Sequence, residues 1–78
     1  MQIKNIIQLT YNIRKCIEQI TSLNEDIATL KHFINANNRW IKNHNNNSLY
    51  AKITQKENQI MLQKEQIKQL IRQLNEQI

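Results

Sequence analysis

Residues 6–34 read IIQLTYNIRKCIEQITSLNEDIATLKHFI, and isoleucine returns in them at every seventh residue from Ile6 to Ile34. A second apolar series lies three residues after the first, and its members are Leu9, Cys16, Leu23 and Leu30. Apolar residues at alternating steps of three and four form one stripe along a slightly underwound helix, and that stripe faces a partner helix. The stretch therefore predicts a coiled-coil seam, with Ile6 at heptad position a and Leu9 at position d.

The composition supports a helical fold. The chain has 78 residues and contains neither glycine nor proline. These two residues are the usual helix breakers and are also needed in tight hairpins of strands. A chain of this length forms one domain at most. We expect a single all-α domain.

The second half of the chain repeats the seven-residue pattern, at Ile53, Ile60, Ile67 and Leu74. Between the halves lies an asparagine-rich stretch, NHNNNS at residues 43–48. Asparagine tolerates turn conformations and competes with the helix for backbone hydrogen bonds. We therefore expect a helix over about 3–43, a turn over about 43–48 and a helix over about 49–77. Residues 22–25 have the spacing of a capping box, but the heptad register runs through them, so the first helix should be continuous.

Two helices joined by this turn should pack antiparallel. A fold about residue 45 sets Leu30 near Ile60 and Leu23 near Ile67, and it leaves the first dozen residues without a cover. An uncovered apolar stripe usually marks an interface. We expect self-association into a helical bundle and binding of a coiled-coil partner. The candidate partner-binding residues are Ile3, Ile6, Ile7, Leu9, Ile17, Met61, Leu62 and Ile71.

The sequence offers no constellation for catalysis. The six acidic residues are scattered, and His32 and His44 lie twelve apart without a cysteine or carboxylate at ligand spacing. The lone Cys16 falls on the seam, where a small buried residue fits. We expect no enzyme activity, no metal and no cofactor. No apolar run approaches the ~20 residues that span a bilayer, and the opening residues MQIKNIIQLTYN lack the apolar core of a secretory signal.

The net charge of +5 raises nucleic acid as a possible partner. The basic candidates on the second helix are Lys64, Lys68 and Arg72. Steps of four residues drift around a helix of 3.6 residues per turn, which spreads these charges over more than one face. The pattern therefore favours a solvated face over a nucleic-acid site.

Three aromatic residues, Phe33, Trp40 and Tyr50, fall around the expected hairpin tip. Their simplest role is to close that end of the hairpin. Because aromatic residues are also favoured as interface anchors, they are candidates for partner contacts.

The layout as a whole resembles the mature part of the phyllogens, the phyllody-inducing effectors secreted by phytoplasmas. The resemblance is carried by the long first helix on Ile13, Ile20 and Ile27, by the asparagine-rich turn, and by a second helix ending in Ile67, Leu70 and Leu74. It implies a bacterial effector that is secreted and acts inside the host cell. Its partners would be the keratin-like coiled-coil domain of plant MADS-domain transcription factors and a ubiquitin-receptor shuttle protein that leads to the proteasome.

Two other classes share these sequence features. A small phage or mobile-element inhibitor would also be short, helical and free of catalytic residues, and it would be cytoplasmic. A structural oligomerisation module would look the same. An apolar surface left over after the hairpin closes would favour protein binding, whereas a gathered lysine surface would favour nucleic acid.

Overall fold

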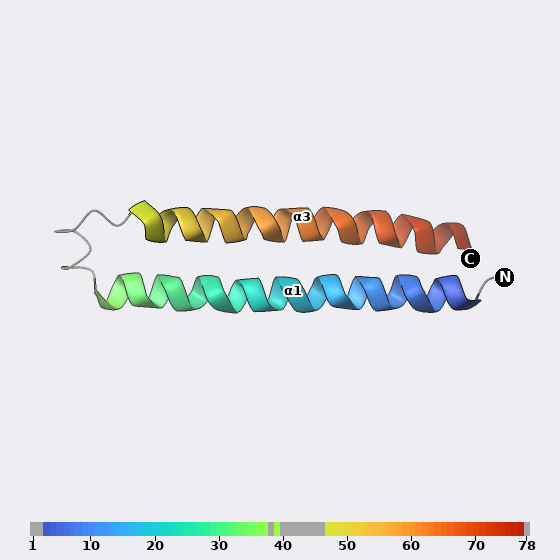
Figure 1. Cartoon of the computed structure of the whole chain (residues 1–78), viewed down its shortest axis with the longest axis horizontal. Helices are drawn as coiled ribbons and strands as arrows, with labels where there is room; N and C mark the ends of the chain where they lie inside the picture. The colour runs from blue at the N-terminus through green and yellow to red at the C-terminus, as the bar shows by residue number, and fades with distance from the viewer. Residues whose placement is uncertain (1–2, 38, 40–46, 78) are drawn as a thin grey trace.

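The structure is a computed structural model that describes residues 3–37, 39 and 47–77. Helix α1 spans Ile3–Ala36 and helix α3 spans Asn47–Gln77. The two helices lie side by side and antiparallel, with both chain ends at one end of the rod (Figure 1). The rod is 61 Å long and 15 by 12 Å across. The expected all-α, two-helix hairpin is confirmed.

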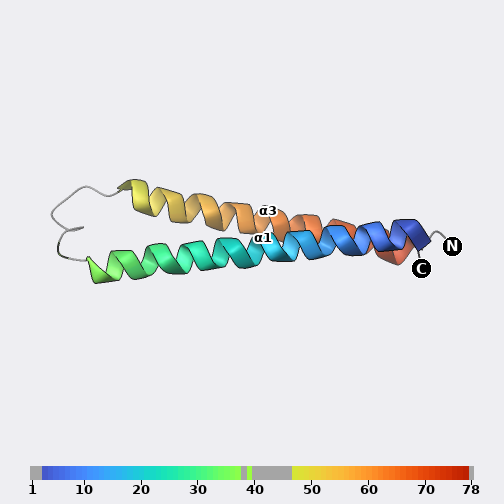
Figure 2. The same ribbon diagram turned by 60° about the horizontal axis from the view of Figure 1, so that its bottom comes forward.

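One continuous seam forms the core. The buried residues are Cys16 and Ile27 on α1 and Ile53, Ile60 and Leu70 on α3. Steps of three and four continue through the half-buried positions of both helices, as heptad packing requires. The two views together show the helices wrapping slightly around each other, so that one stripe of each stays in contact (Figure 2).

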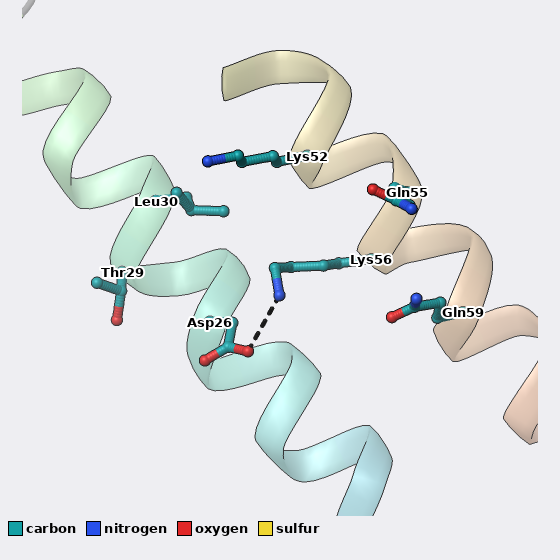
Figure 3. A pocket seen from close by; sticks show the side chains of 7 residues that line it. All are labelled: Asp26, Thr29, Leu30, Lys52, Gln55, Lys56 and Gln59. Carbon is teal, nitrogen blue, oxygen red and sulfur yellow. Dashed lines mark hydrogen bonds and ion pairs between the residues drawn. The ribbon is translucent and has the colours of Figure 1, made fainter. Parts of the chain in front are cut away.

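An interhelical ion pair marks the register of the two helices. The Nζ atom of Lys56 lies 3.2 Å from Oδ2 of Asp26 and donates a hydrogen bond to it (Figure 3). Leu23 and Leu30 both pack against the cluster that contains Ile60. In this register Leu23 lies opposite Ile60, so the expected fold about residue 45 is wrong by about one heptad. The heptad pattern repeats every seven residues and therefore allows both registers, whereas only the observed one joins Asp26 to Lys56.

The expectation that the first dozen residues lack a covering helix is also wrong. Leu9 lines a shallow groove together with Gln73 and Gln77 at the end of α3. Leu9 and Ile6 are half-buried rather than free. Because the register is shifted toward the N-terminus, the last turns of α3 lie against the first turns of α1.

Helix α1 ends at Ala36, earlier than the expected end near residue 43. The backbone N–H of Asn37 donates to the carbonyl oxygen of Phe33 at 3.1 Å, and the Asn37 side-chain Nδ2 donates to the same oxygen at 2.9 Å. The backbone bond is the ordinary i→i−4 bond of the last helical turn, whereas the side-chain bond to the same oxygen competes with the backbone and weakens the helix at this point. The helix is continuous through Ser22, as expected. Residues 40–46, which hold most of the expected turn, lie outside the described residues.

Helix α3 begins at Asn47 and ends at Gln77, close to the expected bounds. Two seam positions in its middle are polar, Lys56 and Gln63, and both are half-buried. Lys56 reaches Asp26 of α1. The side-chain Oε1 of Gln63 is buried and has no hydrogen-bond partner among the described residues. The centre of the α3 seam is therefore weaker than its ends.

Candidate functional site

The hairpin has two sides that differ in chemistry. In an antiparallel pair of helices, heptad positions e and b of both helices lie on one side of the seam, and positions g and c lie on the other. With Ile6 and Ile53 at position a, the e and b positions hold five large apolar residues. We name this set the apolar edge, and its members are Ile3, Ile7, Ile17, Met61 and Ile71.

The apolar edge is open to solvent. The exposed fraction of its five members lies between 44% for Ile71 and 67% for Met61. All five were expected from the sequence to contact a partner. They come from both helices; Ile3, Ile7 and Ile71 lie toward the chain ends, and Ile17 and Met61 lie near the middle of their helices. The hairpin itself leaves this surface without a cover.

The total accessible surface area of the chain also indicates that part of its surface is left uncovered. The chain exposes 6332 Å². A compact monomer of 9.4 kDa is expected to expose about 5,000 Å², so the excess is roughly 1,300 Å². A standard protein interface buries about 800 Å² on each partner. The hairpin therefore has enough surplus surface for one standard interface.

A shallow groove of about 280 Å³ lies beside the apolar edge on α1. It is lined by Ile6, Ile7, Thr10, Tyr11 and Arg14. The Thr10 hydroxyl donates to the backbone carbonyl of Ile6 at 2.8 Å, so this polar side chain is satisfied within its own helix. The groove thus presents apolar walls with a guanidinium at one end.

Tyr11 is held beside this groove by a basic neighbour. The Nζ atom of Lys15 lies 5.4 Å from the centre of the Tyr11 ring, within cation–π range. Lys15 is also 3.4 Å from the Glu18 carboxylate. Glu18 and then Tyr11 are the main causes that raise the pKa of Lys15 above its ordinary value of 10.5. These contacts lie in solvent and orient the ring rather than add stability.

The basic candidates do not form one patch. Lys64 and Lys68 fall at positions e and b, beside the apolar edge, whereas Arg72 falls at the outward position f. Lys68 lies 3.8 Å from Glu65, and both side chains are well exposed. Sequence reasoning missed Arg14, which lies at position b between Ile7 and Ile17. Its heptad position, combined with the register of the two helices, is the signal that would have found it.

The opposite side of the hairpin is rich in amides. A groove of about 370 Å³ there is lined by Gln19, Ser22, Leu23, Gln59 and Gln63. Leu62 is 70% exposed, but position c places it on this amide side. Leu62 directly follows Met61 of the apolar edge but points about 100° further around α3, toward the amide side.

The largest of the described grooves, about 510 Å³, also lies on the amide side near the tip. It is crossed by the ion pair of Asp26 and Lys56, and Lys52 extends above that pair (Figure 3). Its walls are mainly charged and amide side chains.

The aromatic candidates do not close the tip in the described part of the chain. Phe33 is 46% exposed and Tyr50 is 51% exposed. Phe33 falls at position g and Tyr50 at position e, on opposite sides of the seam. Trp40 lies outside the described residues. The expected plug is therefore not formed by the two aromatic residues that can be placed.

Reactive and metal-binding chemistry has little support in the described residues. Cys16 is 5% exposed and sits in the seam as a small core residue. Within the described ranges no group of three His, Cys, Asp or Glu side chains is placed to hold a metal ion. Neither α1 nor α3 is long and apolar enough to cross a membrane.

Comparison of the chain with known protein families, with curated proteins and with solved structures finds no match. The support for the candidate site therefore comes from the residues of this chain alone. Its main features are the apolar edge and the cations that accompany it.

Proposed function

We propose that this chain is a non-enzymatic interaction module whose apolar edge binds an amphipathic helix of another protein. The observation that supports it is the exposure of five large apolar side chains, from both helices, on one side of the hairpin. Singly exposed apolar residues are normal, but a contiguous set on one side usually marks an interface.

The mode of binding follows from the heptad positions. Ile17 of α1 and Ile71 of α3 are both at position e, so they border the same furrow between the helices. A third helix laid in this furrow would contact both and would complete a three-helix bundle. Its own apolar stripe would cover Ile3 and Ile7 toward the chain ends. Helix-in-groove recognition of this kind uses anchors at steps of three, four and seven residues.

The resemblance to the phyllogens names one specific partner of this kind. Under this proposal the bound helix belongs to the keratin-like domain of a plant MADS-domain transcription factor, and a ubiquitin-receptor shuttle protein then delivers the complex to the proteasome. Support for this finer proposal comes from the hairpin layout and from the open apolar edge. The secreted location belongs to the same proposal.

A second candidate function is that of an oligomerisation module, in which a second copy of the hairpin covers the apolar edge. The surplus surface area favours it, because one standard interface would account for most of the excess. Two hairpins joined in this way would form a four-helix bundle. The phage or mobile-element inhibitor class is a variant of the first proposal with a bacterial partner.

The test compares two variants of the chain as bait. Ile7→Ser with Ile17→Ser removes two anchors of the apolar edge, and Leu62→Ser removes an equally exposed residue from the amide side. Circular dichroism should show that both variants stay helical, because none of the three side chains is buried. Baits are then exposed to floral-bud extract, to bacterial lysate and to a purified keratin-like domain.

The proposal predicts that a coiled-coil protein retained by the wild type and by Leu62→Ser is lost with the double isoleucine variant. Retention of the same proteins by all three baits would contradict it. Binding of the purified keratin-like domain decides the phyllogen form of the proposal separately, since the general form requires only that some helical partner depends on the apolar edge.

A further inference from the structure

The apolar edge is accompanied by charge of one sign. Over residues 3–21 of α1 and 61–75 of α3, positions e and b hold the five apolar-edge residues, three small polar residues and three cations; the polar residues are Thr10, Thr21 and Asn75. The cations are Arg14, Lys64 and Lys68. None of these eleven positions holds an aspartate or a glutamate, and the next position e toward the tip holds Glu57. The surface that a partner would contact is therefore apolar and basic.

Two of the three cations form no ion pair with another described residue. Neither Arg14 nor Lys64 takes part in an ion pair between described residues, in contrast to Lys68, which lies 3.8 Å from Glu65. In the register set by Asp26 and Lys56, Arg14 lies on the α1 side of Ile17, level with Lys68, and Lys64 lies on the α3 side about one turn nearer the tip. A helix that covers Ile17 would therefore meet a cation on each of its flanks.

This charge arrangement distinguishes two possible occupants of the apolar edge, a second copy of the chain and a helix of a different protein. A second copy in a two-fold dimer would place the same patch against itself, which brings the unpaired cations of both copies into one interface. Like charges brought together across an interface are strongly unfavourable. A helix with carboxylates on both flanks of its apolar stripe would instead pair with Arg14 on one side and Lys64 on the other.

We propose that the occupant of the apolar edge is an acidic amphipathic helix of a different protein, with Asp or Glu on both sides of its apolar stripe. This inference rests on the proposed function and narrows it to one class of partner. Arg14 is well suited to such a helix because its guanidinium can hold a carboxylate in two parallel hydrogen bonds. Lys64 contributes a point charge that steers the encounter.

The test uses three synthetic helices that share one leucine and isoleucine stripe and differ only at the flanking positions, which are all Glu, all Gln or all Lys. Binding to the full chain is measured by fluorescence anisotropy at ~0.05 M and ~0.5 M salt, which changes the screening length severalfold. The Glu helix should bind about tenfold more tightly than the Gln helix at low salt, and the Lys helix most weakly. The differences in affinity between the three helices should become smaller at high salt.

Two double variants test which cations cause the preference for the Glu helix. Arg14→Gln with Lys64→Gln should bind the Glu and Gln helices equally and leave binding of the Gln helix unchanged. The matched control, Lys52→Gln with Arg72→Gln, removes the same net charge from positions g and f and should keep the preference. If the control loses the preference as fully as the edge variant, the effect is one of net charge and the inference is overturned.

The remaining outcomes separate this inference from the proposed function. Equal binding of all three helices that disappears in Ile17→Ser overturns the acidic partner and leaves helix capture standing. Failure of all three helices to bind overturns both. Sedimentation that shows a dimer at micromolar concentration, dissolved by Ile17→Ser, identifies a second copy as the occupant and also overturns the inference.

Discussion

Replacing Gln63 by leucine should stabilise the hairpin. Gln63 sits at a seam position of α3, and its Oε1 atom is buried without a hydrogen-bond donor among the described residues. A buried acceptor without a partner costs about 1–3 kcal/mol. Leucine has a similar volume and no polar atom, so the free energy of unfolding should rise by roughly that amount.

This gain is large for a chain of 78 residues, whose total stability is expected to be about 4–12 kcal/mol. The assay is urea unfolding followed by the helical signal in circular dichroism, with the slope against urea expected to stay constant. The melting temperature should rise by roughly 4–8 °C for each kcal/mol. The control is Gln66→Leu, an exposed neighbour, which should change stability by less than about 0.5 kcal/mol. A leucine at position 63 that leaves stability unchanged or lowers it would refute the reasoning.

Three further predictions concern the seam and its charges. Ile27→Ala removes a side chain that is 8% exposed and should lower the free energy of unfolding by about 2–5 kcal/mol; an unchanged melting temperature would show that Ile27 is not in the core. A double-mutant cycle of Asp26→Ala and Lys56→Ala should give a coupling of about 0.2–1 kcal/mol that shrinks in salt, and zero coupling at low salt would contradict the register. The pKa of Lys15 lies above its ordinary value because of Glu18, so NMR titration should find it lower in Glu18→Gln. A raised lysine pKa stabilises the fold at pH values below the unfolded-state pKa, so any advantage of the wild type over Glu18→Gln should vanish as the pH rises through the folded-state pKa of Lys15.

The helical hairpin could be predicted because its evidence is local. The isoleucines at Ile13, Ile20 and Ile27 repeat with the coiled-coil period, and such a repeat specifies which side of a helix is buried whatever the partner. The exposure of Ile17 was predictable for the same reason, since position e lies at the margin of the seam. The apolar edge was thus largely visible in the sequence as the apolar residues left outside positions a and d.

The register could not be predicted from the same pattern. A heptad repeat is unchanged by a slip of seven residues, so Leu23 can face either Ile60 or Ile67 with similar apolar contact. The choice depends on weaker terms, among them the pair of Asp26 with Lys56. The earlier end of α1 falls beside Asn37, whose side chain also bonds the carbonyl oxygen of Phe33. The heptad pattern alone does not tell which cations at positions e and b are neighbours, because this depends on the register. This is why Arg14 was missed.

The central claim, that the apolar edge is the binding surface, is tested most directly by a methyl chemical-shift map. The chain is labelled at its isoleucine and leucine methyl groups and titrated with the helix that carries glutamate on both flanks. We predict that the methyl signals of Ile7, Ile17 and Ile71 shift with increasing helix concentration, while that of the equally exposed Leu62 on the amide side stays in place. A titration that moves Leu62 and leaves the three isoleucines unchanged would contradict the account.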